Sequence, residues 1–333
     1  SLAIGNAYSQ SDLTDFLQAG EEDASKLMNA YLDPVIVGLS YGLNGGWYHT
    51  AKAHKPLGVD LDITFNAVFI PDSKATFQPG DLNLSVTTLV EPQDGVVPTI
   101  VGPEIDSRYE TQLETPQGTQ TIEFDGPPGL DFEDKIKVSA VLAPMVQLGV
   151  GVYKNTDLKL RFIPEQEVGD TRIKMLGLGI MHDIKQHIPG IRLVPFDLSV
   201  MVGYTRISGT LGMESIFDKP SDDARRQEMT YSMDAWTFQA IISKKLGIVT
   251  FYGGAGYNSI RSDADVRGSY IIFEGSNPSN DVVLTDPVTI RAKNSSFRFT
   301  AGMRFKFGPI FLHGDYSFQE YNTASVGLGF TVR

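Results

Sequence analysis

The C-terminal third of the chain alternates apolar and polar residues with a period of two over long runs. In a β-strand successive side chains point to opposite faces, so such a run predicts a strand whose two faces have different surroundings. Within residues 297–307 the apolar face carries Phe297, Phe299, Ala301, Met303, Phe305 and Phe307. The other face carries Arg298, Thr300, Gly302, Arg304 and Lys306. The pattern therefore predicts long strands with one continuous apolar face.

The same alternation recurs along the rest of the chain. It is found in residues 60–69, 138–152, 158–162, 198–204, 236–242, 310–320 and 324–332. We count about twelve strands, many of them with ten or more residues, whereas strands of globular proteins usually have five or six. A tilted strand needs roughly 9 to 11 residues to cross a bilayer. These lengths favour membrane-spanning strands, with a soluble β domain as the alternative.

The second face of these strands is rich in glycine and in charged residues, which is typical of the crowded interior of a barrel. We predict an all-β fold, a closed antiparallel transmembrane β-barrel of about 12–14 strands in the bacterial outer membrane. No run of 18 apolar residues is present, which excludes a helical membrane protein. The residues predicted to face the lumen are Asp60, Asp62, Asn66, Lys159, Arg161, Arg298, Arg304, Lys306, His313 and Asp315. Opposite charges in a lumen either pair into rungs or line a polar path, and the sequence leaves both open.

The connections between the predicted strands follow the rule of short periplasmic turns and longer outer loops. Short turns are expected at residues 307–309, 244–247 and 153–155, and a longer periplasmic connection at 182–195. Long excursions at 211–227 and 263–293 are expected at the opposite, outer end.

The N-terminal segment, residues 1–33, lacks this alternation. Glu21, Glu22 and Asp23 favour a helix start, and Pro34 is expected to end the helix. The apolar stripe of this helix is formed by Leu27, Met28, Tyr31 and Leu32. We expect a plug in or under the barrel, or else a periplasmic surface helix. Residues 1–9 are either the tail of a secretory signal or an ordinary mature terminus.

The predicted barrel, residues 34–333, contains one long acidic insertion at 71–136. This segment has thirteen acidic and three basic residues, so it holds ten of the twelve excess negative charges of the chain. Residues 82–88 and 119–124 could add two strands and raise the total to fourteen. The acidity could serve a divalent cation, a partner or a solvated surface.

Residues 23–34, 42–48, 57–60 and 182–197 resemble an uncharacterised family of outer-membrane barrels from the Bacteroidota. That family is broadly similar to the long-chain fatty-acid transporters, which are barrels with an N-terminal plug in the lumen. The resemblance implies passive uptake of a hydrophobic or amphipathic small molecule, and it brings no catalytic residue.

Catalytic, metal and cofactor chemistry finds little support in the sequence. Asp60 and Asp62 match a phosphatase nucleophile motif, but that motif requires a buried parallel strand followed by helices. His182 and His187 are five residues apart, which does not place them on one helical face as a zinc helix requires. Cysteine is absent, so thiolate sites are excluded. We therefore expect no enzyme and no cofactor.

Two functions remain open at this point. The first is the uptake implied by the resemblance, with outer-membrane lipid and a hydrophobic small molecule as partners. The alternative is a non-enzymatic accessory or structural subunit that docks other outer-membrane proteins or lipoproteins through its acidic outer segment. A net charge of −12 argues against nucleic acid as a partner.

Overall fold

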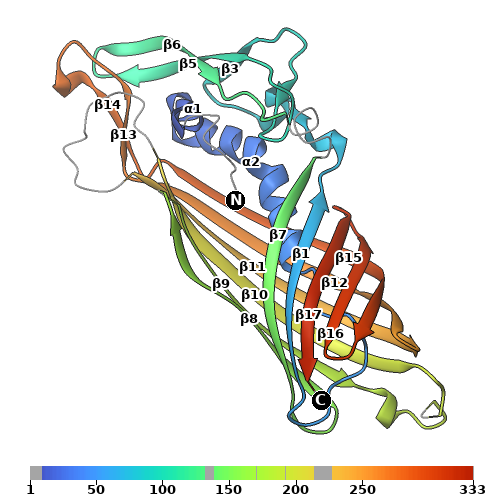
Figure 1. Ribbon diagram of the computed structural model, residues 1–333. Helices are drawn as coiled ribbons and strands as arrows, with labels where there is room; N and C mark the ends of the chain where they lie inside the picture. Colours follow the sequence, from blue (N-terminus) through green and yellow to red (C-terminus); the bar gives the residue numbers. More distant parts are fainter. Residues whose placement is uncertain (1–9, 132–138, 170, 192, 214–226, 333) are drawn as a thin grey trace.

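Ten antiparallel strands close into a barrel in the part of the chain that the structure describes (Figure 1). The structure is a computed structural model and describes residues 10–131, 139–169, 171–191, 193–213 and 227–332. The expectations for residues 1–9 and 214–226, and for Glu133 and Asp134, lie outside these ranges. Around the barrel the strands are β1 (Val59–Phe69), β17 (Thr323–Val332), β16 (Ile310–Phe318), β15 (Val288–Phe307), β12 (Val249–Arg267), β11 (Glu228–Leu246), β10 (Asp197–Gly212), β9 (Thr171–Asp183), β8 (Thr156–Val168) and β7 (Ala140–Gly151).

The closed antiparallel barrel is confirmed, but the expected number of strands is wrong. Strands β3 (Thr87–Glu91), β5 (Ser107–Thr115) and β6 (Gly118–Gly126) form a separate sheet, and β2 (Thr76–Phe77) pairs with β4 (Val97–Pro98). Strands β13 (Ser269–Phe273) and β14 (Val282–Thr285) form a hairpin of their own. Alternation along the sequence identifies a segment as a strand, but it does not show which sheet the strand joins. Strands outside the barrel wall are therefore included in the number expected from the sequence.

The turns and loops lie at the two ends of the barrel as the alternation predicts. One end, here the short-turn end, holds the connections at residues 152–155, 184–196, 247–248 and 308–309. The other, the long-loop end, holds residues 70–131 and the β13–β14 hairpin. The excursion expected at 263–293 is shorter than predicted, because β12 continues to Arg267 and β15 begins at Val288. Near the long-loop end the outward side chains of β12 and β15 are polar. The alternation of apolar and polar residues therefore no longer marks these parts of the chain as strands.

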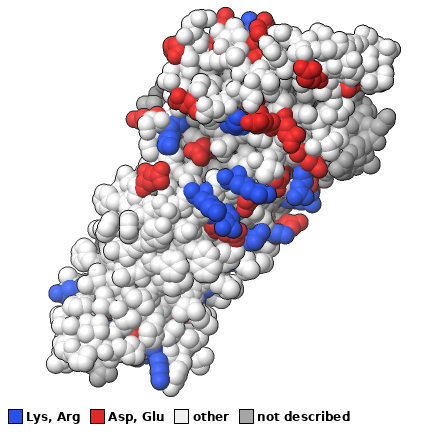
Figure 2. Space-filling view, turned by 180° about the vertical axis from the view of Figure 1, so that it is seen from behind, with Lys and Arg blue, Asp and Glu red and all other residues white. Residues whose placement is uncertain are grey.

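The outer face of the barrel is an apolar belt. Outward side chains such as Leu178, Phe238, Phe299 and Leu328 are about half exposed or more. Toward the long-loop end this face becomes charged, and seen from behind most charged side chains gather in that half (Figure 2). A closed barrel satisfies its backbone hydrogen bonds internally, and an apolar exterior needs lipid around it. The barrel therefore spans a bacterial outer membrane.

One seam of the wall is incomplete. Strands β7 and β8 pair only from Gln147–Arg161 to Gly151–Asp157, next to the short-turn end. A register shift in β8 between Ile163 and Gln166 follows directly. The two strands therefore part toward the long-loop end.

The N-terminal part of the chain runs from the long-loop end down into the lumen (Figure 1). It comprises α1 (Gln10–Asp15), η1 (Phe16–Ala19), α2 (Glu21–Leu43) and a coil, residues 44–58, that leads down to β1 (Figure 1). Among the described residues, none of the helices is long and apolar enough to cross a membrane. The prediction that Pro34 ends the helix is wrong, since α2 continues for nine residues beyond it. An interior proline costs a helix about 3 kcal/mol, and burial of Ile36, Val37 and Tyr41 against the wall offsets this cost.

Three apolar clusters follow the chain down through the barrel. The first joins η1 and the start of α2 to the outer sheet and the β13–β14 hairpin, with Phe16 packed edge-on against Tyr31 and Tyr109. The second surrounds the end of α2, and the third surrounds Trp47 and Tyr48. The helix thus connects an outer cap to the barrel interior.

Met303 lies near the middle of the outward apolar stretch of β15, residues 297–307, and is 43% exposed. We predict that Met303→Arg destabilises the barrel in lipid vesicles by about 2–4 kcal/mol, because a charge at the bilayer midplane is costly. Urea unfolding in vesicles measures this difference. The control is Ser295→Arg on the same strand and face, above the belt, which should change stability by less than about 1 kcal/mol. Equal costs at both positions would contradict a lipid-facing belt.

Candidate functional site

Two buried arginines from distant parts of the wall hold the end of α2. On β8, the guanidinium of Arg161 donates to the carbonyl oxygens of Leu43 at 2.8 Å and Gly45 at 2.6 Å. On β15, Arg298 donates to the carbonyl oxygen of Asn44 at 2.5 Å. The last carbonyls of a helix lack partners and carry partial negative charge, so cations stabilise this end. We call these two side chains the arginine clamp.

Trp47 extends this contact into the wall. The guanidinium of Arg161 lies over its ring, 3.7 Å from the centroid, in a cation–π arrangement. The ring packs flat on β9 and β10, where a Cβ at Gly179 or Gly203 would come within 2.6 or 2.7 Å of it. Glycine at these two positions is what lets the indole approach the sheet.

Below the clamp, histidines pair with aspartates. The Nε2 of His49 lies 3.1 Å from Asp60 Oδ2, and the Nε2 of His313 lies 3.0 Å from Asp62 Oδ2. At the short-turn end His54 contacts Asp157 through its backbone N–H and its ring Nδ1, both at 2.9 Å. His49 and His54 belong to the coil, so two of the three pairs fasten the plug to the wall.

Nine of the ten residues predicted to face the lumen are buried; Lys306, near the short-turn end, is partly exposed. Asn66 donates to the carbonyl oxygens of Gly42 and Ala143. Asp315 accepts from Tyr252 at 2.9 Å, and Arg304 lies 4.2 Å from the centroid of the Phe311 ring. Lys159 and Asp60 flank Gly149 in the register of β1, β7 and β8. The arginines of this set contact the plug backbone and aromatic rings, and the carboxylates contact His and Tyr.

The plug candidates Leu27, Met28 and Tyr31 are buried and Leu32 is partly buried. They lie higher than expected, in the apolar cluster of the outer cap. The sequence reasoning missed Arg161 and Arg298 as partners of the plug, because their partners are backbone carbonyls. It also missed Trp47, which has no periodic signal.

Asp23 joins the plug to the acidic insertion. Its buried carboxylate accepts hydrogen bonds from the backbone N–H groups of Ser85, Val86 and Thr87 at 2.8–3.0 Å. The neighbouring Glu22 is exposed, and its hydrogen bond with Lys26 lowers the pKa of this carboxyl. Asp23 is therefore more than a helix-start residue, since it orders the loop that leads into β3.

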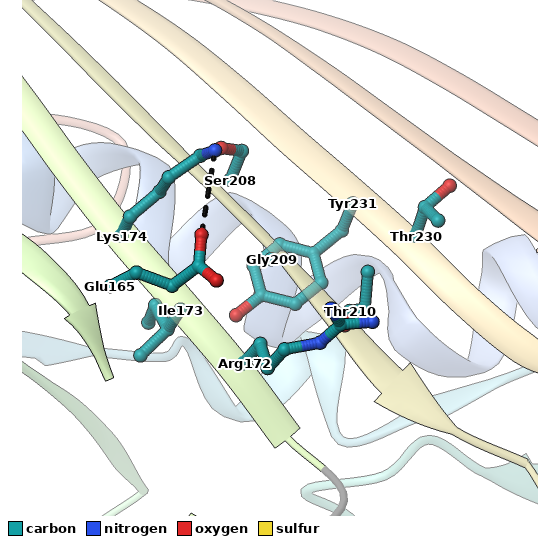
Figure 3. A pocket seen from close by; sticks show the side chains of 9 residues that line it. All are labelled: Glu165, Arg172, Ile173, Lys174, Ser208, Gly209, Thr210, Thr230 and Tyr231. Atoms are coloured by element: carbon teal, nitrogen blue, oxygen red, sulfur yellow. Dashed lines mark hydrogen bonds and ion pairs between the residues drawn. The ribbon is translucent and has the colours of Figure 1, made fainter. Parts of the chain in front are cut away.

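Two cavities meet at Tyr231 on β11. The first, of about 280 Å³, is surrounded by residues from both faces of the wall around Gly209, with Arg172, Lys174 and Glu165 as its charged members (Figure 3). The second, of about 150 Å³, lies between α2 and the wall and is almost entirely apolar. Its lining includes Leu32, Ile36, Leu39, Met229, Met233, Ala264 and Ile290. A Cβ at Gly209 would come within 2.6 Å of the Tyr231 hydroxyl, so the tyrosine lies directly beneath this glycine.

The charged groups of the first cavity are loosely held. Arg172 contacts Thr210 at 3.1 Å and Glu228 at 3.5 Å, and Lys174 lies 3.7 Å from Glu165. In the described part of the chain, no group of three or more His, Asp or Glu residues is arranged to hold a metal ion. The charged groups of the first cavity thus lie on the outer face of the wall, and the apolar cavity lies on its lumen face.

The model of a protein family of unknown function, DUF6588, matches residues 1–332. The chain belongs to this family. No protein of curated function matches the sequence.

Several solved outer-membrane barrels are similar to this member of the family. The outer-membrane protease OmpT of Escherichia coli is 8% identical, with a TM-score of 0.32, covering 85% of this chain and 100% of OmpT. The translocator domain of the autotransporter NalP from Neisseria meningitidis is 11% identical, with a TM-score of 0.31 and coverages of 91% and 96%. Ail of Yersinia pestis is 8% identical, with a TM-score of 0.27 and coverages of 84% and 100%. Resemblances at these TM-scores do not inform the function of the chain.

We predict that Arg161→Ala loosens the plug, because it leaves the carbonyls of Leu43 and Gly45 unpaired at a cost of about 1–3 kcal/mol each. The variant should melt at a lower temperature in detergent and show a higher ion conductance in planar bilayers than the wild type. Arg261→Ala, on the exposed outer face of β12, is the control and should change neither. A variant with wild-type melting and conductance would contradict the role of the clamp.

Asp23→Ala is predicted to release the start of the insertion from α2, because three backbone donors lose a charged acceptor worth about 1.5–3 kcal/mol per bond. Limited proteolysis of the folded barrel should then cut between β2 and β3 faster than in wild type, as followed by mass spectrometry. Glu21→Ala removes another exposed carboxylate at the start of the same helix and should leave the cleavage rate unchanged. Similar rates in both variants would show that the carboxylate of Asp23 does not order this loop.

Proposed function

We propose that this protein is a plugged outer-membrane barrel that binds an amphipathic small molecule at its long-loop half for passive uptake, without catalysing a reaction. The observation that carries the proposal is the apolar cavity between α2 and the wall. Apolar cavities of about this size stay dry and accept small apolar groups. The resemblance to the long-chain fatty-acid transporters supports the same class of molecule.

The polar side chains in the lining of this cavity support an amphipathic rather than a purely apolar ligand. Tyr231 and Ser262 line the same cavity as the apolar side chains, so a molecule can place its apolar chain against α2 and its polar head beside these two hydroxyl groups. Each methylene moved out of water contributes about 0.8 kcal/mol.

Complete passage requires the plug to move. In the short-turn half the coil fills the lumen, with Trp47 and Ala51 fully buried and the arginine clamp above them. The parting of β7 and β8 provides a place where the wall can yield, because fewer backbone hydrogen bonds join these two strands. Binding in the apolar cavity and release of the arginine clamp are thus separate steps.

The accessory role stays a second candidate because of the outer sheet. Strand β6 is paired on one side only in the described part of the chain, and Glu123 and Asp125 on it are exposed. An unpaired strand edge can add a strand from a partner. Recovery of a stoichiometric partner protein after purification in mild detergent would favour this role over uptake.

Ala264 points from β12 into the apolar cavity and is 5% exposed. We predict that Ala264→Phe fills the cavity and weakens binding of a fluorescent alkyl amphiphile by about tenfold or more, since it displaces two or so methylenes at 0.8 kcal/mol each. Fluorescence titration of the purified barrel in detergent measures the affinity.

The matched control is Ala255→Phe, on the lipid-facing side of the same strand. It should bind the probe as tightly as wild type, and both variants should keep the folded electrophoretic mobility of the barrel. Equal affinities for Ala264→Phe and wild type would rule out this cavity as the binding site.

A further inference from the structure

Two histidines that are not helical neighbours meet at the short-turn end. His182 lies near the end of β9, and His187 closes the short 3-10 turn η4 (Lys185–His187) in the connection to β10. Their Nε2 atoms are 3.0 Å apart, and their rings stack with centroids 5.2 Å apart and planes inclined by 26°. The turn folds back on the strand, so the five-residue spacing brings together two imidazoles that no regular helix would pair.

The His182 ring is oriented by a polar neighbour on its other side. Thr156 Oγ1, at the start of β8, lies 2.8 Å from His182 Nδ1. When Nδ1–H donates to this hydroxyl, the lone pair of Nε2 is directed at His187. A second partner that fixes the tautomer in this way is the usual support of a metal-ligating histidine.

The backbone around His187 is also held in place. The side-chain amide of Gln186 donates to the carbonyl oxygens of Lys154 and Asp183 at 3.1 and 2.9 Å. Lys185 Nζ donates to the carbonyl of Val194 at 2.6 Å. A site whose ligands are positioned before binding loses less entropy when the ion arrives.

We propose that His182 and His187 bind one divalent ion of the kind that prefers imidazole, such as Zn²⁺ or Cu²⁺, with water in the remaining positions. Zinc–nitrogen bonds of about 2.0–2.1 Å in a tetrahedron place two ligand atoms about 3.3 Å apart. The observed 3.0 Å therefore needs only a small opening. His187 is exposed, which leaves room for water ligands, and as the ion binds the proton of His187 is carried on Nδ1, so that both Nε2 lone pairs face the ion.

The site ties the β9–β10 connection to β8 through Thr156, at the end of the barrel opposite the apolar cavity. It is independent of the proposed uptake. The alternative explanation of the short Nε2–Nε2 distance is a hydrogen bond between the two imidazoles without a metal ion. The experiment below distinguishes a metal site from this hydrogen bond.

The test uses the full chain without a histidine tag, stripped with a chelator, in detergent. Isothermal titration with Zn²⁺ should show one ion per chain, and titration with Mg²⁺, which prefers oxygen ligands, should show none. His182→Gln and His187→Gln should each weaken Zn²⁺ binding at least tenfold, because even outer-shell partners of a metal are worth about 10- to 100-fold. Ile188→Ala, on the adjacent exposed residue, should keep the wild-type affinity.

Electron paramagnetic resonance with Cu²⁺ provides a second readout that does not depend on the heat of binding. The wild type should show coupling to two nitrogens, and each glutamine variant coupling to one. No saturable Zn²⁺ binding, or an unchanged affinity in both glutamine variants, would overturn the proposal and leave only the hydrogen bond.

Discussion

The structure depends on the hydrogen bonds that two wall arginines donate to the end of α2. A helix that ends inside a barrel exposes carbonyls where water is scarce, and such groups are costly unless they are paired. Arg161 and Arg298 pair them from β8 and β15. The carbonyls in turn supply acceptors to two buried guanidinium groups, neither of which forms a salt bridge with a carboxylate within the described ranges. The plug and the wall therefore stabilise each other. The guanidinium groups pair the carbonyls at the end of the helix, and these carbonyls are hydrogen-bond acceptors for the buried guanidinium groups.

This arrangement divides the barrel into two halves with different properties. The short-turn half is filled by the coil, with Trp47 packed on glycines and His–Asp pairs beneath it. The long-loop half is less tightly filled, since α2 leaves an apolar cavity on the side of β11 and β12, and β7 and β8 part there. Under the proposed uptake, the long-loop half can adapt to a ligand while the short-turn half keeps the barrel closed.

In the cap, too, a charged side chain of one segment is stabilised by backbone groups of another segment. Asp23 is buried with Lys26 Nζ 3.9 Å from its carboxylate, and three successive backbone donors of the insertion stabilise its charge at shorter distances. The start of α2, the outer sheet and the β13–β14 hairpin then form one apolar cluster. The acidic insertion is consequently a folded part of the cap, and its acidic side chains on β6 face outward.

The sequence by itself determined the barrel, its orientation of faces and the sides on which turns and loops lie, because lipid and lumen impose opposite demands on alternate residues of every wall strand. The faces of Phe299, Arg298 and Arg161 can be read from this alternation alone. Only the tertiary structure decided that the wall has ten strands, that α2 passes through Pro34, and that His182 meets His187. These features depend on contacts between segments that are far apart in the sequence and on side chains that bind backbone carbonyls. Neither kind of contact produces a periodic pattern of residues.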